Sequence, residues 1–199
     1  MTDQIYIFDG SRKLHIDNAL AVLADIQDLR PIKVRCNTNP DFVDRMVQAS
    51  FNDERNQVDA GALVGNIMRS PELTQLEGFN KIVLFDKDLY SYDNEKVFNW
   101  VFGGCYSLDD GKLIALSTAR LKDEVHAKDV IRHEVGHMFG APNPARNDVY
   151  EHLGNHCGNP ICVMHQRDTV EASRTAAYEQ ARRGGLGYCN RCEEDIRRS

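Results

Sequence analysis

Residues 133–140 read His-Glu-Val-Gly-His-Met-Phe-Gly, and this stretch constrains the fold more than any other part of the chain. His133 and His137 are four residues apart, so on an α-helix their side chains lie one turn apart on the same face. Two imidazoles at that spacing can bind one zinc ion. Gly140 has no Cβ, so it can adopt a positive φ and end the helix abruptly. The sequence therefore predicts a helix that presents two metal ligands and ends shortly after the second.

The residues around this motif favour a half-buried helix that begins near Asp123 or Glu124, because acidic groups suit the positive end of a helix dipole. Glu134 lies beside the two histidines, where a carboxylate can act as a general base toward a water molecule at the metal. The alternative is a surface helix that carries these residues by coincidence. Apolar side chains interleaved with the histidines are expected to pack this helix on a core: Val130, Ile131, Val135, Met138 and Phe139.

A catalytic zinc ion normally has three protein ligands, and the third must come from elsewhere in the chain. Three residues after Gly140, where the metzincin pattern His-Glu-x-x-His-x-x-Gly-x-x-His has its last histidine, this chain has Asn143, a poor zinc ligand. Further along it reads His156-Cys157-Gly-Asn-Pro-Ile-Cys162-Val-Met164, and then Cys189-Asn-Arg-Cys192. This run resembles the archaemetzincin family, in which the helix and glycine are followed by His-Cys-x4-Cys-x-Met and a C-terminal Cys-x-x-Cys.

The resemblance implies that His156 is the third zinc ligand, displaced by an insertion within Ala141–Asn155. Two residues separate the glycine from the histidine in the family pattern, and fifteen do here. The inserted stretch reads as a loop beside the metal, and longer loops cost folding little. Glu151 and His152, which lie in the same stretch, remain open as alternative third ligands. Met164 matches the methionine of the Met-turn, a tight turn beneath the zinc.

The cysteines form a second group with metal-ligand spacing. Four thiolates in two closely spaced pairs are what a structural zinc ion requires, and disulfides are the alternative. No signal peptide begins the sequence, so nothing indicates an oxidising compartment, and we expect zinc and a cytoplasmic location. Cys36 and Cys105 fall in strand-like runs and are expected to be buried, reduced thiols. The paired residues are Cys157 with Cys162, and Cys189 with Cys192.

Composition limits the remaining classes of function. A chain of 199 residues, 42% of them hydrophobic, can bury one core. We expect a single domain with an N-terminal part over 1–140 and a C-terminal part over 141–199. No apolar run approaches the roughly 20 residues of a membrane span, and a net charge of −6 argues against general nucleic-acid binding. The expected partner is therefore a peptide or protein substrate, with no nucleic acid and no membrane, while the oligomeric state stays open.

Hydrophobic periodicity and turn signals predict alternating elements in the first half of the chain. Asp110-Gly111 indicates a hairpin between the last two strands. The order indicates an α/β fold: a mixed, mostly parallel twisted sheet with an antiparallel edge strand, backed by helices, plus a smaller zinc-stapled C-terminal part that is mostly loop. Strands are expected over 5–8, 32–36, 81–86, 100–107 and 112–119, and helices over 17–28, 41–50, 59–69 and 169–183.

The residues just before the histidine helix are Ser117, Thr118, Ala119 and Arg120. In metzincins the strand in this place is an edge strand that lines the cleft. The resemblance therefore implies that these four residues offer backbone hydrogen bonds to an extended substrate. The alternative is an ordinary strand.

As a whole, the resemblance implies a zinc-dependent metallopeptidase that holds two zinc ions. The catalytic zinc would bind the three histidines, the structural zinc would bind the four paired cysteines, and Glu134 would be the general base. Tyr150 or Tyr178 is open as the donor of a further hydrogen bond to the substrate. The alternative is a noncatalytic or latent zinc-binding protein whose cleft is blocked by residues 141–155.

Overall fold

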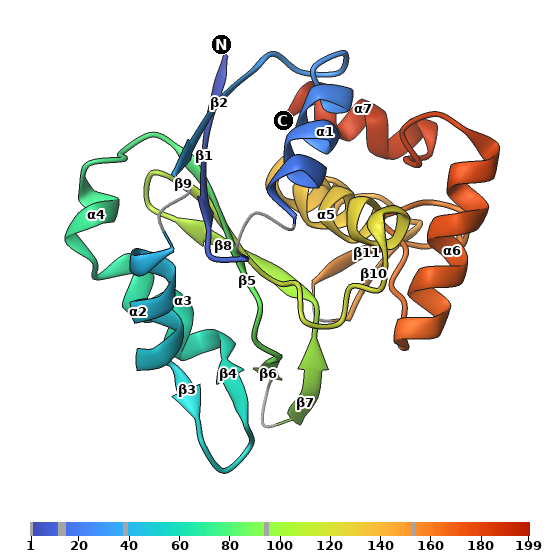
Figure 1. Cartoon of the computed structure of the whole chain (residues 1–199). Coiled ribbons are helices and arrows are strands. Elements are labelled where there is room, and N and C mark those ends of the chain that lie inside the picture. The colour runs from blue at the N-terminus through green and yellow to red at the C-terminus, as the bar shows by residue number, and fades with distance from the viewer. Residues whose placement is uncertain (1, 12–14, 38–39, 94–95, 153) are drawn as a thin grey trace. The chain divides into compact units, whose positions relative to one another are not determined.

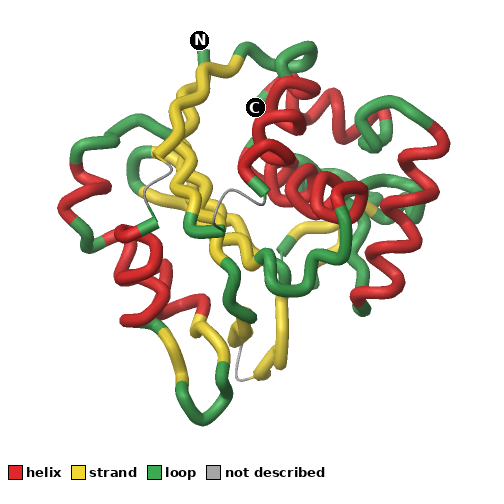
Figure 2. Tube along the Cα trace, in the orientation of Figure 1, coloured by secondary structure: helices red, strands yellow, loops and turns green. Residues whose placement is uncertain are grey.

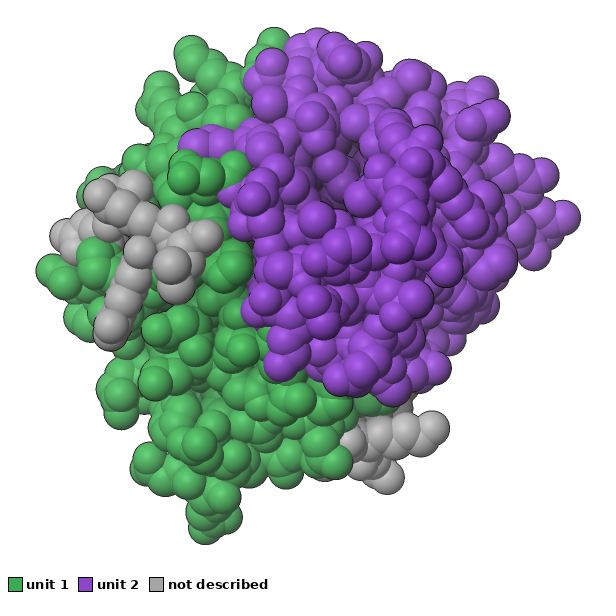
Figure 3. Space-filling view, turned by 45° about the vertical axis from the view of Figure 1, so that its right-hand side comes forward, with its two compact units in different colours: residues 1–17, 32–120 green, residues 18–31, 121–199 purple. Residues whose placement is uncertain are grey.

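The computed structural model describes residues 2–11, 15–37, 40–93, 96–152 and 154–199. The fold is mixed α/β, as Figures 1 and 2 show. The chain divides into two compact units, which Figure 3 colours separately. Unit 1 comprises residues 1–17 and 32–120, and unit 2 comprises residues 18–31 and 121–199. The division at residue 140 that was expected from the sequence stays a prediction.

Unit 1 is built on a twisted sheet with the strand order β2-β1-β5-β9-β8. Neighbouring strands from β2 to β9 are parallel, and β8 pairs antiparallel with β9 at one edge. The predicted mostly parallel sheet with an antiparallel edge strand is therefore confirmed. The strands are β1 (Asp3–Asp9), β2 (Ile32–Asn37), β5 (Asn80–Phe85), β8 (Gly103–Leu108) and β9 (Gly111–Ser117).

The hairpin between β8 and β9 is confirmed, with Leu108 paired with Gly111 across a two-residue loop. The predicted strand over 100–107 is wrong at its start, because β7 (Lys96–Val101) ends at Val101 and β8 begins at Gly103. The expectation of an edge strand at Ser117 is also wrong. β9 lies between β5 and β8, and the Ser117 and Thr118 N–H groups donate to Phe102 O and Phe85 O at 2.7 Å each.

Apolar faces of the helices α2 (Asp41–Ala49) and α3 (Ala60–Met68) and of strands β1, β5 and β9 form the core of unit 1. Val43 and Val47 of α2 and Leu63 and Ile67 of α3 are buried in this core. The remaining elements of the unit are α2 (Asp41–Ala49), α3 (Ala60–Met68) and α4 (Pro71–Thr74), and a second sheet in the order β3-β4-β6-β7. Its strands are β3 (Phe51–Asn52), β4 (Gln57–Asp59), β6 (Leu89–Asp93) and β7 (Lys96–Val101).

Unit 2 is mostly helical and contains all the metal-ligand candidates. Its elements are α1 (Ile16–Ile26), which begins at the end of unit 1, α5 (Glu124–Met138), the hairpin β10 (Val149–Glu151) and β11 (Asn155–Cys157), α6 (Val170–Arg183) and α7 (Asn190–Arg198).

Three sequence-based expectations need correction. Residues 141–155 are not all loop, since β10 and β11 pair antiparallel, and the chain ends in a helix, α7. Cys36 is exposed on β2 and Cys105 is only half-buried. Among the described helices, none combines the length and the hydropathy that crossing a membrane requires.

Candidate functional site

Helix α5 presents the two histidines as the sequence predicts. Asp123 is its N-cap, and the carboxylate accepts a hydrogen bond from His126 N at 3.0 Å. At the other end Gly140 has a φ of +74°. Gly140 N donates to His137 O, and Ala141 N donates to Gly136 O, which is the Schellman arrangement. The chain therefore leaves the helix directly after the second histidine.

Three histidines lie together in unit 2. The nitrogen atoms of His133, His137 and His156 that could bind a metal are all within 4.8 Å of one another. His133 and His137 Nε2 are 3.2 Å apart, and the His156 ring centroid is 5.2 Å from each of the other two. Two nitrogens about 2.0–2.1 Å from one tetrahedral zinc ion would be about 3.4 Å apart. The spacing of the helix pair fits a single zinc ion.

Backbone carbonyls orient two of these rings. His133 Nδ1 donates to Val163 O at 2.7 Å, and His156 Nδ1 donates to Gly154 O at 3.1 Å. With the proton on Nδ1, the Nε2 atom of each neutral ring carries a lone pair for a metal. Burial lowers the pKa of His133 to about 4. Burial also lowers the pKa of His156, to about 3, and repulsion from His133 in its charged form adds to this shift. Both rings are neutral at neutral pH, as metal ligands must be.

Glu134 is buried next to His133 on α5. The residue is 7% exposed, and Oε2 accepts no hydrogen bond from any described residue. Burial raises the pKa of this carboxyl to about 8. Because buried polar atoms normally have partners, the orphaned oxygen indicates that a group from outside the chain hydrogen-bonds here.

His156 reaches the cluster from strand β11, where it pairs with Tyr150 of β10. Glu151 and His152, the alternative third ligands, are exposed and lie outside the described metal-ligand groups. Asn143 is a turn residue: its side chain accepts a hydrogen bond from Ala145 N at 2.9 Å. The structure thus brings His156, of the three candidates, to the two histidines of α5.

Met164 lies beneath the histidine helix. It is fully buried, and its carbonyl accepts a hydrogen bond from Cys157 N at 2.9 Å. The sulfur packs against Gly136, where a Cβ would lie only 2.2 Å away. The segment that holds Met164 also supplies Val163 O to His133, so this turn both supports the helix and orients a ligand.

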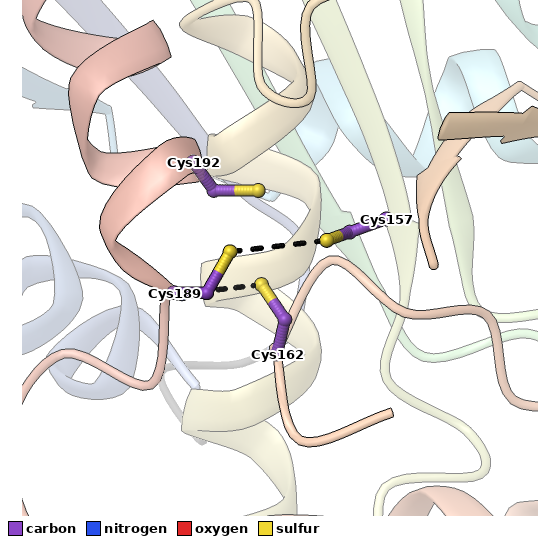
Figure 4. A group of neighbouring side chains, drawn as sticks. All are labelled: Cys157, Cys162, Cys189 and Cys192. Atoms are coloured by element: carbon purple, nitrogen blue, oxygen red, sulfur yellow. Dashed lines mark hydrogen bonds between the residues drawn. The ribbon is translucent and has the colours of Figure 1, made fainter. Parts of the chain in front are cut away.

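The four paired cysteines form a separate cluster in unit 2. Their sulfur atoms all lie within 4.8 Å of one another and point toward one another in Figure 4. Cys157 belongs to β11, Cys162 to the turn before Met164, and Cys189 and Cys192 to the start of α7. Cys157 and Cys189 Sγ are 3.8 Å apart, far beyond the roughly 2.05 Å of a disulfide.

The chemistry of this cluster suits a tetrahedral metal ion. Sulfurs about 2.3 Å from one zinc ion would be about 3.8 Å apart, which matches the 3.8 Å separation. Hydrogen bonds from Cys162 and Cys192 lower the pKa of Cys157, and the bond to Cys157 raises that of Cys162 to about 12. Two groups of residues, one of histidines and one of cysteines, could therefore hold metal ions.

No family model and no curated protein matches this sequence. Among solved structures, the chain is similar to metalloproteinase-II from Bacteroides fragilis, with a TM-score of 0.47 and 12% sequence identity. The similarity covers 85% of this chain and 47% of that chain. This chain thus spans about half the length of the neighbour, and a likeness of this extent carries no argument about activity.

The remaining predicted site residues, Ser117 to Arg120, belong to unit 1, whereas both clusters belong to unit 2. Ser117 and Thr118 are buried, and Arg120 forms an ion pair with Asp88 at 2.5 Å. Sequence reasoning missed three residues that support the clusters. Arg146 contacts two of the cysteines, while Gly136 and Tyr188 pack together with Met164 beside the histidine helix. Only for Gly136, between two ligands on a helix, does the sequence give a signal, because glycine inside a helix commonly marks a close approach.

Proposed function

We propose that this chain is a zinc-dependent metallopeptidase. The observation that carries the proposal is the triad of His133, His137 and His156 next to a buried carboxylate with an unpartnered oxygen. A metal site that serves only structure needs no base beside it. The nitrogen donors are neutral imidazoles in a tight group, which is the donor set of catalytic zinc.

Zinc bound by the three histidines would polarise a peptide carbonyl and lower the pKa of a water molecule toward about 7. Glu134 is the residue that moves protons. Burial raises the pKa of its carboxyl, which makes the ionised group a stronger base. As a carboxylate, Glu134 would take a proton from water and pass it to the leaving amine. The carbonyls of Val163 and Gly154 hold the His133 and His156 rings in one orientation during this exchange.

Other parts of the proposal rest on the sequence patterns alone. The archaemetzincin resemblance, a cytoplasmic location and a peptide or protein substrate belong here. The second zinc at the cysteines has further support in the clustering of their four sulfur atoms. Substrate binding by Ser117, Thr118, Ala119 and Arg120 also comes from the sequence alone, and it would have to use groups other than the Ser117 and Thr118 N–H, because those already donate within the chain. For the further hydrogen bond we favour Tyr150 over Tyr178, because the Tyr150 ring centroid is 6.0 Å from that of His156.

The test is Glu134→Gln, which keeps the size of the side chain but removes its capacity to accept a proton. We expect zinc content equal to that of the parent chain and a fall in peptide cleavage of about 10²–10⁴-fold, the usual contribution of a general base. The matched control is Glu124→Gln, the same change on the same helix at a side chain that is 69% exposed. The control should cleave peptides as fast as the parent.

Two results would contradict the proposal. Cleavage that survives Glu134→Gln unchanged would remove the assigned base. A parent chain that holds zinc at the histidines but cleaves nothing in a diverse peptide mixture would favour the noncatalytic or latent zinc protein.

A further inference from the structure

Arg146 lies in the segment 141–155 and has every N–H of its guanidinium matched to an acceptor. Nε and Nη2 donate to the two oxygens of Asp148 at 2.8 Å each, and Nη1 donates to Asp195 Oδ2 at 2.6 Å. The two remaining N–H groups point to sulfur: Nη1 to Cys192 Sγ at 3.4 Å and Nη2 to Cys157 Sγ at 3.5 Å. The side chain is only 13% exposed.

The two sulfur contacts join different halves of the cysteine cluster. Cys157 comes from β11, and Cys192 comes from α7. Arg146 therefore bridges the two cysteine pairs from outside the group of sulfurs. A zinc ion with four thiolates keeps two units of negative charge, and N–H donors from a permanent cation offset such charge.

The same arginine anchors the segment that precedes His156. Its partner Asp148 accepts a hydrogen bond from Gly158 N through its carbonyl at 2.7 Å. Its other partner, Asp195 on α7, also accepts one from Asn143 N at 2.9 Å. Residues 143–148 are thus held against the cysteine cluster by backbone contacts as well as by the guanidinium.

We propose that Arg146 is a positioning residue of the cysteine metal site: it binds one sulfur of each cysteine pair and slows the release of the metal. The inference rests on the part of the proposed function in which the four cysteines hold zinc, and it is independent of peptidase activity. Lysine cannot replace arginine in this role, because its single nitrogen lacks the planar fork that reaches two carboxylates and two sulfurs together.

The experiment follows metal release from the cysteines alone. Cobalt(II) replaces zinc, and the sulfur-to-cobalt charge-transfer absorption, which histidine ligands do not produce, is recorded after addition of excess EDTA. The variants are Arg146→Gln and Arg146→Lys. We expect both to lose the absorption about 10–100-fold faster than the parent, as for other outer contacts of metal ligands. Circular dichroism and the elution volume in size-exclusion chromatography check that each variant is folded.

The matched control is Arg191→Gln. Arg191 shares Asp148 with Arg146, at 3.1 Å, but its side chain is 60% exposed. This variant should release cobalt within about twofold of the parent, because exposed ion pairs contribute little. Equal release from Arg146→Gln and the parent would overturn the inference. The inference would also be overturned if Arg146→Lys released cobalt at the rate of the parent, because positive charge alone would then explain the effect. It would fail as well if Arg191→Gln released cobalt as fast as Arg146→Gln.

Failure of the inference and failure of the proposed function are distinguishable. A parent chain without the charge-transfer absorption would overturn both the inference and the cysteine zinc site. A parent chain with the absorption, slow release and no peptidase activity would support Arg146 while contradicting the catalytic proposal.

Discussion

At the scale of single residues, Gly136 shows how closely the histidine helix is packed. A Cβ at this position would lie 2.2 Å from Met164 Sδ and 3.0 Å from Tyr188 Cε1. Both neighbours are buried, and Tyr188 is fixed by a hydrogen bond to Arg132 O at 2.6 Å. One position between the two histidines is therefore restricted to glycine by packing.

We expect Gly136→Ala to lower the free energy of unfolding by about 1–3 kcal/mol, the usual cost of overpacking a core. Zinc at the histidines should weaken too, since a displaced Met164 moves the neighbouring Val163 carbonyl away from His133. Urea denaturation and a zinc assay measure the two effects. Gly65→Ala is the control: in α3 its Cβ meets only the Arg69 head group at 3.5 Å, so stability should rise by about 0.5–1 kcal/mol. Equal stability of Gly136→Ala and the parent would contradict this packing.

The sequence predicts the ligands better than it predicts their supports. His133, His137 and His156 stand in a recognisable pattern, and their meeting needs only one helix and one returning segment. Arg146 gives no such signal, because an arginine in a polar stretch is typical of a solvated surface. Its partners lie two to 49 residues away in the chain, and only the folded chain brings them together.

At the scale of elements, the contact between α5 and α6 buries polar groups. His126 Nε2 lies 3.1 Å from Ser173 Oγ. Asp129 is buried one turn further along α5, and the Gln180 amide, in the orientation that satisfies both of its ends, donates to Asp129 Oδ1 at 3.0 Å. Burial raises the pKa of Asp129 to about 7. The folded chain therefore keeps this carboxyl protonated well above the pH at which the unfolded chain releases the proton.

This shift predicts a pH dependence of stability with a definite sign. The folded state binds the Asp129 proton more tightly than the unfolded state does. The stabilisation of the folded state by this proton is therefore fully present below the ordinary pKa of 3.8 and is lost as pH rises toward about 7. Relative to Asp129→Asn, the parent should lose up to about 1.4 kcal/mol of unfolding free energy per pH unit in that window. Urea denaturation between pH 4 and 8 measures the difference. Glu179→Gln, an exposed change on α6, should show no such slope, and a flat difference for Asp129→Asn would refute the assignment.

The sequence predicts the helices and strands whose hydrophobic residues recur with a clear period. The helices α1, α2, α3, α5 and α6 and the strands β1, β2, β5 and β9 lie within a few residues of their expected bounds. Strands such as β3, β4, β10 and β11 have two or three residues, too few to show alternation. Helix α7 buries only Cys192 and Ile196, and its charged residues form i,i+4 ion pairs. With so few buried apolar residues, its sequence resembles a polar tail and does not predict a helix.

At the scale of the whole molecule, contacts between residues far apart in the chain decide which segments belong to unit 2. The pattern of residues along the sequence does not show these contacts. Residues 18–31 join it although they precede most of unit 1. Arg30 Nη1 donates to Ile196 O at 3.2 Å, and Arg132 Nη2 to Asp25 Oδ2 at 2.9 Å. These pairs are more than 100 residues apart in sequence, so the α/β class is predictable from the order of elements but the membership of each unit is not.

The most direct test of the central claim is the zinc content of the purified chain, compared with His156→Ala and with His152→Ala as the matched control from the same segment. Each sample is assayed before and after competition with a chelator, because two histidines alone can retain zinc weakly. We predict two zinc ions per chain in the parent and in His152→Ala, one at the cysteines and one at the histidines, and a single tightly held ion in His156→Ala. Two equally tight ions in His156→Ala, or the loss of one in His152→Ala, would contradict the histidine centre on which the proposed function depends.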